Sequence, residues 1–188
     1  AKVLGIDLMT NFRQPYFAHS VQNFWARWHI SLSTWFRDYI YFPLGAGRGS
    51  KLRKSMNLMI VYTISGLWHG AALKYVAWGM LNGAMQVVEG LIPSRKPRHP
   101  RLHLIASILF TDFLILITML VFRAGSLSTA YSMLLKIPTE WGVEALATDF
   151  SPMQALCLGI CTLILFAIEL VHERRKTLTE LTDRLPAA

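Results

Sequence analysis

The chain has 188 residues, of which 53% are hydrophobic and only 16% are charged. Soluble domains carry about 25% charged residues, so this composition, with its apolar residues gathered in long runs, predicts an integral membrane protein. The formal net charge of +8 is carried between those runs, as in the cytoplasmic loops of membrane proteins, and we therefore predict no nucleic-acid partner.

Residues 1–19 mix apolar and polar side chains and contain Pro15, which predicts a loop. In residues 20–42, Ser20 is placed to cap a helix, and aromatic and apolar side chains recur at helical spacing. The residues of that stripe are Trp25, Trp28, His29, Leu32, Phe36 and Tyr39. The segment is too polar to span a bilayer, so we predict an amphipathic or re-entrant helix that ends at Pro43.

Four later runs are long and apolar enough to cross a bilayer as helices. They cover about residues 56–73, 75–92, 102–122 and 153–171. We therefore predict an all-α fold, a polytopic membrane helical bundle in which the amphipathic or re-entrant helix precedes four spans. All of residues 1–188 are expected to belong to one membrane domain.

The charges between the predicted spans indicate their orientation. Segments 44–55, 93–101 and 173–176 are basic, whereas the loop 123–152 holds more acids than bases. Four spans place the three basic segments on one side of the membrane, which satisfies the positive-inside rule with Lys74 as the single exception. The C-terminus is then expected in the cytoplasm.

Two consecutive spans carry signals for close packing. Gly66 and Gly70 form a G-x-x-x-G pattern, and Gly79 and Gly83 form another. Such pairs let helix backbones approach closely, although glycine is also simply common in membrane helices. We predict that the first two spans pack tightly together.

Ionisable residues inside spans are candidate functional residues, because charge in hydrocarbon is costly. Glu89 and Glu169 lie near span ends, where pairing with the basic loops explains them. Asp112 fits a structural pairing as well as a functional role. His69, in "ISGLWHGAAL", follows Trp68 between glycines, and here function is favoured over a structural hydrogen bond to a neighbouring helix.

His29 lies on the aromatic face of the amphipathic helix, so it is expected to point into the protein and to join His69. Imidazole can take a proton from a hydroxyl near neutral pH and return it to a leaving group, so the pair fits a membrane-embedded reaction centre. No hydrolase, metalloprotease or nucleotide-binding motif accompanies it, and an H-x-x-x-x-D pattern fails at Thr34. Cys157 and Cys161 share a helix face without further ligands, so we predict neither a disulfide nor a metal site.

Two stretches resemble a known family. "NFRQPYFAHSVQNFWARWHISLSTWFRDYIYFPLGAGR" followed by "SGLWHGAALKYVAWGMLNG" is similar to the membrane-bound O-acyltransferases, and to their alginate O-acetyltransferase branch above all. "FRAGSLSTA" at 122–130 also resembles that branch. The resemblance covers about residues 6–130, with a mild departure in the glycine-rich loop at 45–48. Members of the family are over twice this size, so the chain is expected to be their C-terminal catalytic part.

The resemblance implies transfer of an acetyl group from a cytoplasmic thioester donor, acetyl-CoA or another acyl thioester, towards hydroxyls of an extracytoplasmic polysaccharide. That acceptor would be an alginate-like exopolysaccharide or a cell-wall glycan. The implied catalytic residues are His69 and His29, without a bound cofactor or metal. Supporting residues are expected to be three tryptophans along the passage and an interfacial polar cluster: Trp28, Trp35, Trp68, Arg37 and Asp38.

The resemblance further implies a bacterial inner or plasma membrane and a partner, an extracytoplasmic SGNH-type acetyltransferase or a polysaccharide-modification complex. One alternative is D-alanyl transfer to teichoic acid, since those enzymes share the fold and a helix similar to "WHISLS". Acyl transfer to peptidoglycan or lipid is another. A non-catalytic membrane scaffold or small-molecule conduit is the alternative outside the enzymes, and it predicts that His29 and His69 tolerate replacement by Gln.

Overall fold

The structure, a computed structural model, describes residues 5–93, 99–139 and 151–182. Within these ranges all regular elements are helical, which confirms the predicted all-α fold. In chain order they are η2 (Pro15–Phe17), α1 (Val21–Arg27), α2 (Ile30–Phe36), η3 (Arg37–Tyr41), α3 (Lys51–Trp68), α4 (Leu73–Leu91), α5 (Pro100–Arg123), α6 (Leu127–Lys136) and α8 (Pro152–Thr182). The chain divides into two compact units, Ala1–Leu134 and Leu135–Ala188, and the first holds the candidate site.

The single helix predicted for residues 20–42 is wrong, because the structure breaks it at Trp28 and His29. Ser20 does cap the first part, accepting a hydrogen bond from the backbone N–H of Asn23 at 3.0 Å. The backbone then turns at His29, whose φ of 46° and ψ of 54° lie in the left-handed region. After α2 one π-helical turn follows, and Tyr39 on it is 68% exposed rather than facing inward.

Three of the four predicted spans correspond to helices, whereas the span predicted for 56–73 is broken after Trp68, because residues 69–72 form a turn. Those for 102–122 and 153–171 lie within two helical stretches, Pro100–Arg123 and Pro152–Arg174, that are long and apolar enough to cross a membrane. The helical parts of the other two are α3 and α4, which do not meet the same test of length and hydropathy. A membrane crossing by α3 and α4 stays a prediction.

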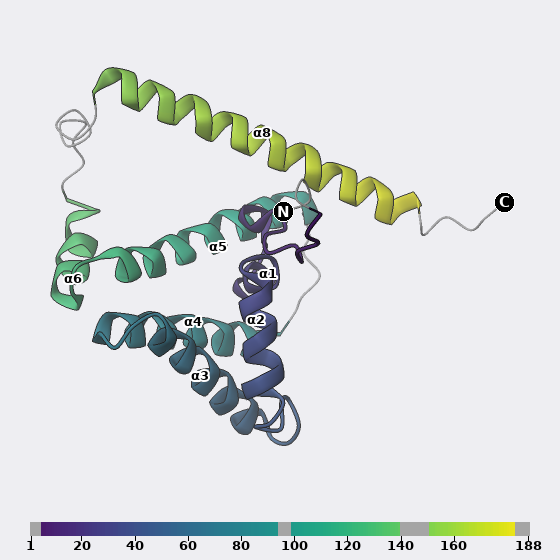
Figure 1. Cartoon of the computed structure of the whole chain (residues 1–188), viewed down its shortest axis with the longest axis vertical. Coiled ribbons are helices and arrows are strands. Elements are labelled where there is room, and N and C mark those ends of the chain that lie inside the picture. Colours follow the sequence, from purple (N-terminus) through teal and green to yellow (C-terminus); the bar gives the residue numbers. More distant parts are fainter. Residues whose placement is uncertain (1–4, 94–98, 140–150, 183–188) are drawn as a thin grey trace. The chain divides into compact units, whose positions relative to one another are not determined.

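Close packing of α3 against α4 is confirmed, and glycines permit it. The two helices make the most extensive helix–helix contact of the described residues (Figure 1). A Cβ atom on Gly66 would meet the carbonyl of Tyr75 and lie 3.3 Å from the Cα of Gly79. A Cβ atom on Gly79 would in turn meet the carbonyl of Tyr62. Backbones this close exclude any larger residue at these two positions.

Buried polar groups connect α4 to α1. The side chain of Asn82 is fully buried. Its Oδ1 accepts from the Trp25 indole N–H at 3.2 Å, and its amide donates to the carbonyl of Trp78 at 2.9 Å. Because a buried amide must be paired to be tolerated, Asn82 fixes the position of α1 on α4.

Candidate active site

His69 lies where α3 ends, rather than in the middle of a helical span. Trp68 is the last residue of α3, and the N–H of His69 still donates to the carbonyl of Gly66 at 3.0 Å. Gly70 follows with a φ of 152°, a conformation that side chains other than glycine rarely adopt. The ring of Tyr75 packs against Gly70, so the chain turns immediately after the imidazole. Gly70 therefore terminates the helix instead of packing within it, which corrects the prediction for that glycine.

Three aromatic rings surround the imidazole of His69. The ring centroids of Trp68, Trp78 and Phe122 lie 5.5, 5.3 and 5.1 Å from it, at interplanar angles of 88°, 89° and 86°. Edge-to-face contacts of this kind are favourable and directional. Within the described residues neither ring nitrogen of His69 has a hydrogen-bond partner, so both are available to a ligand. We call these three rings the aromatic cage.

His29 approaches the same region from the corner between α1 and α2. The two imidazoles lie within electrostatic range of each other. His29 and Trp68 also line one open depression of 420 Å³, together with Ser31, Leu32 and Trp35. The structure thus places His29 with Trp35 and Trp68 around one depression, and Trp68 also contacts the imidazole of His69.

The other predicted supporting residues lie elsewhere. Trp28 stacks on Phe24, with 5.6 Å between ring centroids, and braces the inside of the α1–α2 corner. Arg37 donates from Nε to the Asp38 carboxylate at 2.8 Å, and both side chains are exposed. This hydrogen bond raises the pKa of Arg37. Arg37 and Asp38 therefore form an exposed ion pair, and Arg37 also lines a pocket between α1, α2, α3 and α4.

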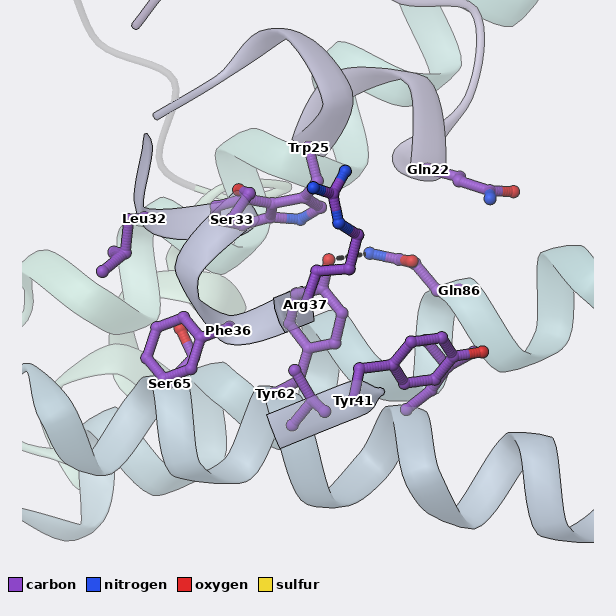
Figure 2. A pocket seen from close by; sticks show the side chains of 12 residues that line it. Gln22, Trp25, Leu32, Ser33, Phe36, Arg37, Tyr41, Tyr62, Ser65 and Gln86 are labelled. Atoms are coloured by element: carbon purple, nitrogen blue, oxygen red, sulfur yellow. Dashed lines mark hydrogen bonds between the residues drawn. The ribbon is translucent and has the colours of Figure 1, made fainter. Parts of the chain in front are cut away.

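A second hollow lies beside the depression and reaches into the bundle. This pocket of 240 Å³ is enclosed by α1, α2, α3 and α4, and Figure 2 shows the side chains that line it. The Tyr62 hydroxyl accepts a hydrogen bond from the amide of Gln86 inside it (Figure 2). Leu32 lines both this pocket and the depression at His29.

A third hollow, of 330 Å³, adjoins the pocket on the other side. The two share the walls formed by Gln22, Tyr41, Leu58 and Gln86. The third hollow is also lined by Lys51 and Lys54, at the start of α3. The pocket therefore shares lining residues both with the hollow that Lys51 and Lys54 line and with the depression at His29.

Three other charged residues lie in or beside the predicted spans: Glu89 and Lys74 bind backbone groups, and Asp112 has an unpaired carboxylate oxygen among the described residues. The carboxylate of Glu89 accepts from the backbone N–H of Gln22 at 2.9 Å, at the start of α1, rather than pairing with a basic loop. The ammonium group of Lys74 donates to the carbonyl of Ala124 at 2.7 Å, at the end of α5. Asp112 has a buried Oδ1 without a partner among the described residues.

Sequence reasoning missed Asn11, Trp78 and the Tyr62–Gln86 pair. Trp78 lies in the stretch "YVAWGMLNG", which carries part of the family resemblance. Its position nine residues after His69, across a tight turn, could have indicated that the two side chains meet. Asn11 lies 20 residues before Ser31, whose backbone N–H it binds, and no local pattern points to that contact.

Comparison of the sequence with known proteins identifies the family of this chain. The pattern of the MBOAT, or membrane-bound O-acyltransferase, family matches residues 3–127, which include both histidines and the aromatic cage. Probable alginate O-acetylase AlgI of Azotobacter vinelandii is 34% identical over 165 residues, 87% of this chain and 32% of that protein. Peptidoglycan O-acetyltransferase of Helicobacter pylori (strain ATCC 700392 / 26695) is 38% identical over 131 residues, 69% of this chain and 25% of the relative.

Teichoic acid D-alanyltransferase of Bacillus subtilis (strain 168) also matches, at 31% identity over 90 residues, 44% of this chain and 23% of the relative. The chain thus spans between about a quarter and a third of the length of these curated relatives. More than half of the chain fits the family pattern. The chain belongs to the membrane-bound O-acyltransferase family.

Proposed function

We propose that this protein is an O-acetyltransferase that moves an acetyl group from a thioester donor towards hydroxyls of an extracytoplasmic polysaccharide, by transfer to an acceptor hydroxyl or to the hydroxyl of an intermediate carrier. One observation carries the proposal: an imidazole with free ring nitrogens lies in an aromatic cage beside a second histidine, within the part that fits the family. Two relatives with the wider matches are named as O-acetylating enzymes, one for alginate and one for peptidoglycan. Both acceptors are carbohydrate polymers.

His69 acts as the general base of this reaction. It takes the proton from the acceptor hydroxyl as the hydroxyl oxygen attacks the thioester carbonyl carbon. The tetrahedral intermediate collapses, the C–S bond breaks, and the imidazolium returns the proton to the sulfur leaving group. One C–O bond replaces one C–S bond, and no oxidant, reductant or metal takes part. His29 lies on the donor side, where it orients the thioester.

The donor arrives through the three hollows. Lys51 and Lys54 in the third hollow suit the phosphate groups of an acyl thioester such as acetyl-CoA, because lysine binds phosphate as a point charge. The polar groups of Tyr62 and Gln86 inside the pocket suit the amides of a pantetheine arm. The acetyl group then passes Leu32 to reach the depression at His29.

The setting of this activity is a bacterial inner or plasma membrane, with the C-terminus in the cytoplasm. An SGNH-type acetyltransferase or a polysaccharide-modification complex outside the cytoplasm completes delivery to the polymer. D-alanyl transfer to teichoic acid is the second candidate, favoured by the B. subtilis relative, whose match covers less than half of this chain. Neighbouring genes for an SGNH-type enzyme or for a D-alanyl carrier system distinguish the two.

The test compares His69→Gln with His103→Gln in a deletion strain, at matched protein levels. His103 is exposed, outside the cage, and serves as the control. Mass spectrometry of surface polysaccharide measures acetyl esters. We expect His69→Gln to abolish them, a loss of at least about 100-fold, and His103→Gln to preserve them. Wild-type acetylation in His69→Gln would instead support a scaffold or conduit.

A further inference from the structure

The segment Asn11–Gln14 clamps the corner at which His29 lies. The backbone N–H of Arg13 donates to the carbonyl of Arg27 at 2.9 Å, before the corner. After the corner, the N–H of Ile30 donates to the carbonyl of Asn11 at 3.0 Å. The Asn11 side-chain Oδ1 accepts from the N–H of Ser31 at 2.9 Å. The corner is therefore bound on both sides by a segment that lies 14 to 20 residues earlier in the chain.

The clamp replaces the cap that α2 lacks. The first N–H groups of a helix have no partner within it, and the residue before the helix normally supplies a side-chain acceptor. His29 occupies that position and makes no side-chain cap. Asn11 instead satisfies the first two N–H groups of α2, through its carbonyl and its side chain. As a result, the imidazole of His29 is not used for capping.

The same contacts hold His29 in a strained conformation. A residue other than glycine in the left-handed region persists only where surrounding contacts impose it. Next to His29 these contacts are the two hydrogen bonds that Asn11 accepts from the N–H groups of Ile30 and Ser31, together with the ring of Phe12, whose centroid is 6.4 Å from the imidazole. Phe12 also packs edge-to-face on Trp28, 4.9 Å between centroids.

No hydrogen bond at the ring itself orients His29. A functional histidine is often held by a hydrogen bond to its second ring nitrogen. The Nδ1 atom of His29 is buried and has no partner in the described part of the chain. The direction of the imidazole therefore depends on the backbone conformation at residue 29, and that conformation depends on Asn11.

We propose that Asn11 is the positioning residue of His29. Its carbonyl and side-chain oxygens impose the left-handed turn that aims the imidazole into the depression shared with Trp68. The catalytic consequence rests on the acetyl transfer proposed above, whereas the positioning itself does not.

The kinetic test uses the protein in membranes with acetyl-CoA and polysaccharide. In Asn11→Ala, kcat falls about 10- to 100-fold while KM for the donor changes less than about twofold, because misplacement of a catalytic group by about 1 Å costs rate. Asn11→Asp keeps an acceptor oxygen and retains most of the rate. Ser151→Ala is the matched control: it removes the cap of α8, where Ser151 Oγ accepts from the N–H of Gln154 at 3.3 Å. Wild-type kcat in Asn11→Ala, or an Asn11→Asp variant as slow as Asn11→Ala, overturns the proposal.

A second measurement does not depend on activity. Hydrogen–deuterium exchange at the imidazole C2 position, followed by mass spectrometry, reports the surroundings of each histidine. Asn11→Ala is expected to change the exchange rate of His29 several-fold and to leave His103 unchanged, and Ser151→Ala is expected to change neither. If Asn11→Ala accumulates poorly, Asn11→Ser replaces it in this measurement. Its side chain is shorter, and we expect the same several-fold change in the exchange rate of His29. Unchanged His29 exchange in either Asn11 variant overturns the proposal, even if no acetyl transfer is found at all.

Discussion

At the scale of single residues, the imidazole of His69 is positioned by ring edges instead of hydrogen bonds. Each edge-to-face contact contributes about 0.5–1.5 kcal/mol, so three of them hold the ring while leaving both nitrogens free. Phe122 is the most distant of the three in sequence, and it comes from α5. Phe122 therefore makes the position of His69 depend on the packing of a separate helix.

This dependence predicts the effect of Phe122→Ala. Loss of one wall gives the His69 ring more freedom, and we expect acetyl transfer to fall about tenfold. Phe110→Ala is the control, because Phe110 is exposed on the same helix. Acetyl ester formation is measured in membranes with equal amounts of each variant. Equal rates of acetyl transfer for the two variants would show that the aromatic cage does not contribute to catalysis.

The histidine pair was predictable from sequence because each histidine lies in a short local motif. The role of Asn11 was not, since its contact with Ser31 joins two segments that only the tertiary fold brings together. The Tyr62–Gln86 pair was hidden for the same reason, with its two partners on α3 and α4.

At the scale of helices, α3 and α4 approach closely at Gly66 and Gly79, where an added Cβ atom would meet the backbone of the other helix. The long apolar runs predicted α4, α5 and α8 well, and α3 up to Trp68, because the hydropathy of each run is a property of the local sequence. The prediction of one helix for residues 20–42 was wrong at Trp28 and His29, because the helical spacing of aromatic residues continues there although the backbone turns. That turn is imposed by residues 11–13, so no window of local sequence contains its cause.

The glycine contact predicts opposite effects for two similar substitutions. Gly66→Ala forces α3 away from α4, and we expect it to destabilise the protein by about 2 kcal/mol, in the range of overpacked interiors. Gly90→Ala lies on α4, where a Cβ atom meets nothing within 4 Å. It is expected to be neutral or stabilising by up to about 1 kcal/mol, because alanine favours helix more than glycine.

Thermal unfolding in detergent compares the two variants with wild type. A Gly66→Ala protein as stable as Gly90→Ala would show that the two helices can separate at no cost.

At the scale of the whole molecule, the charges between the helices predict a topology. A reporter fused after Arg175 is expected to behave as cytoplasmic, and one inserted near Glu144 as extracytoplasmic, because basic segments stay inside. Glu144 lies outside the described residues, so this prediction comes from charge alone. Paired phosphatase and fluorescent-protein fusions measure both positions, and the reverse pattern would overturn the orientation.

The contact between Gly66 and Gly79 has a consequence for how the protein tolerates different lipids. Trp78 directly precedes Gly79, and His69 follows Gly66 by three residues. The imidazole of His69 therefore lies next to the point where the backbones of α3 and α4 touch. Helices respond to a thicker or thinner bilayer mainly by tilting. Two helices joined at that point tilt together, and the distance between His69 and Trp78 is preserved. We therefore expect the contact between His69 and Trp78 to be insensitive to lipid chain length, whereas the contact with Phe122 depends on the separate helix α5.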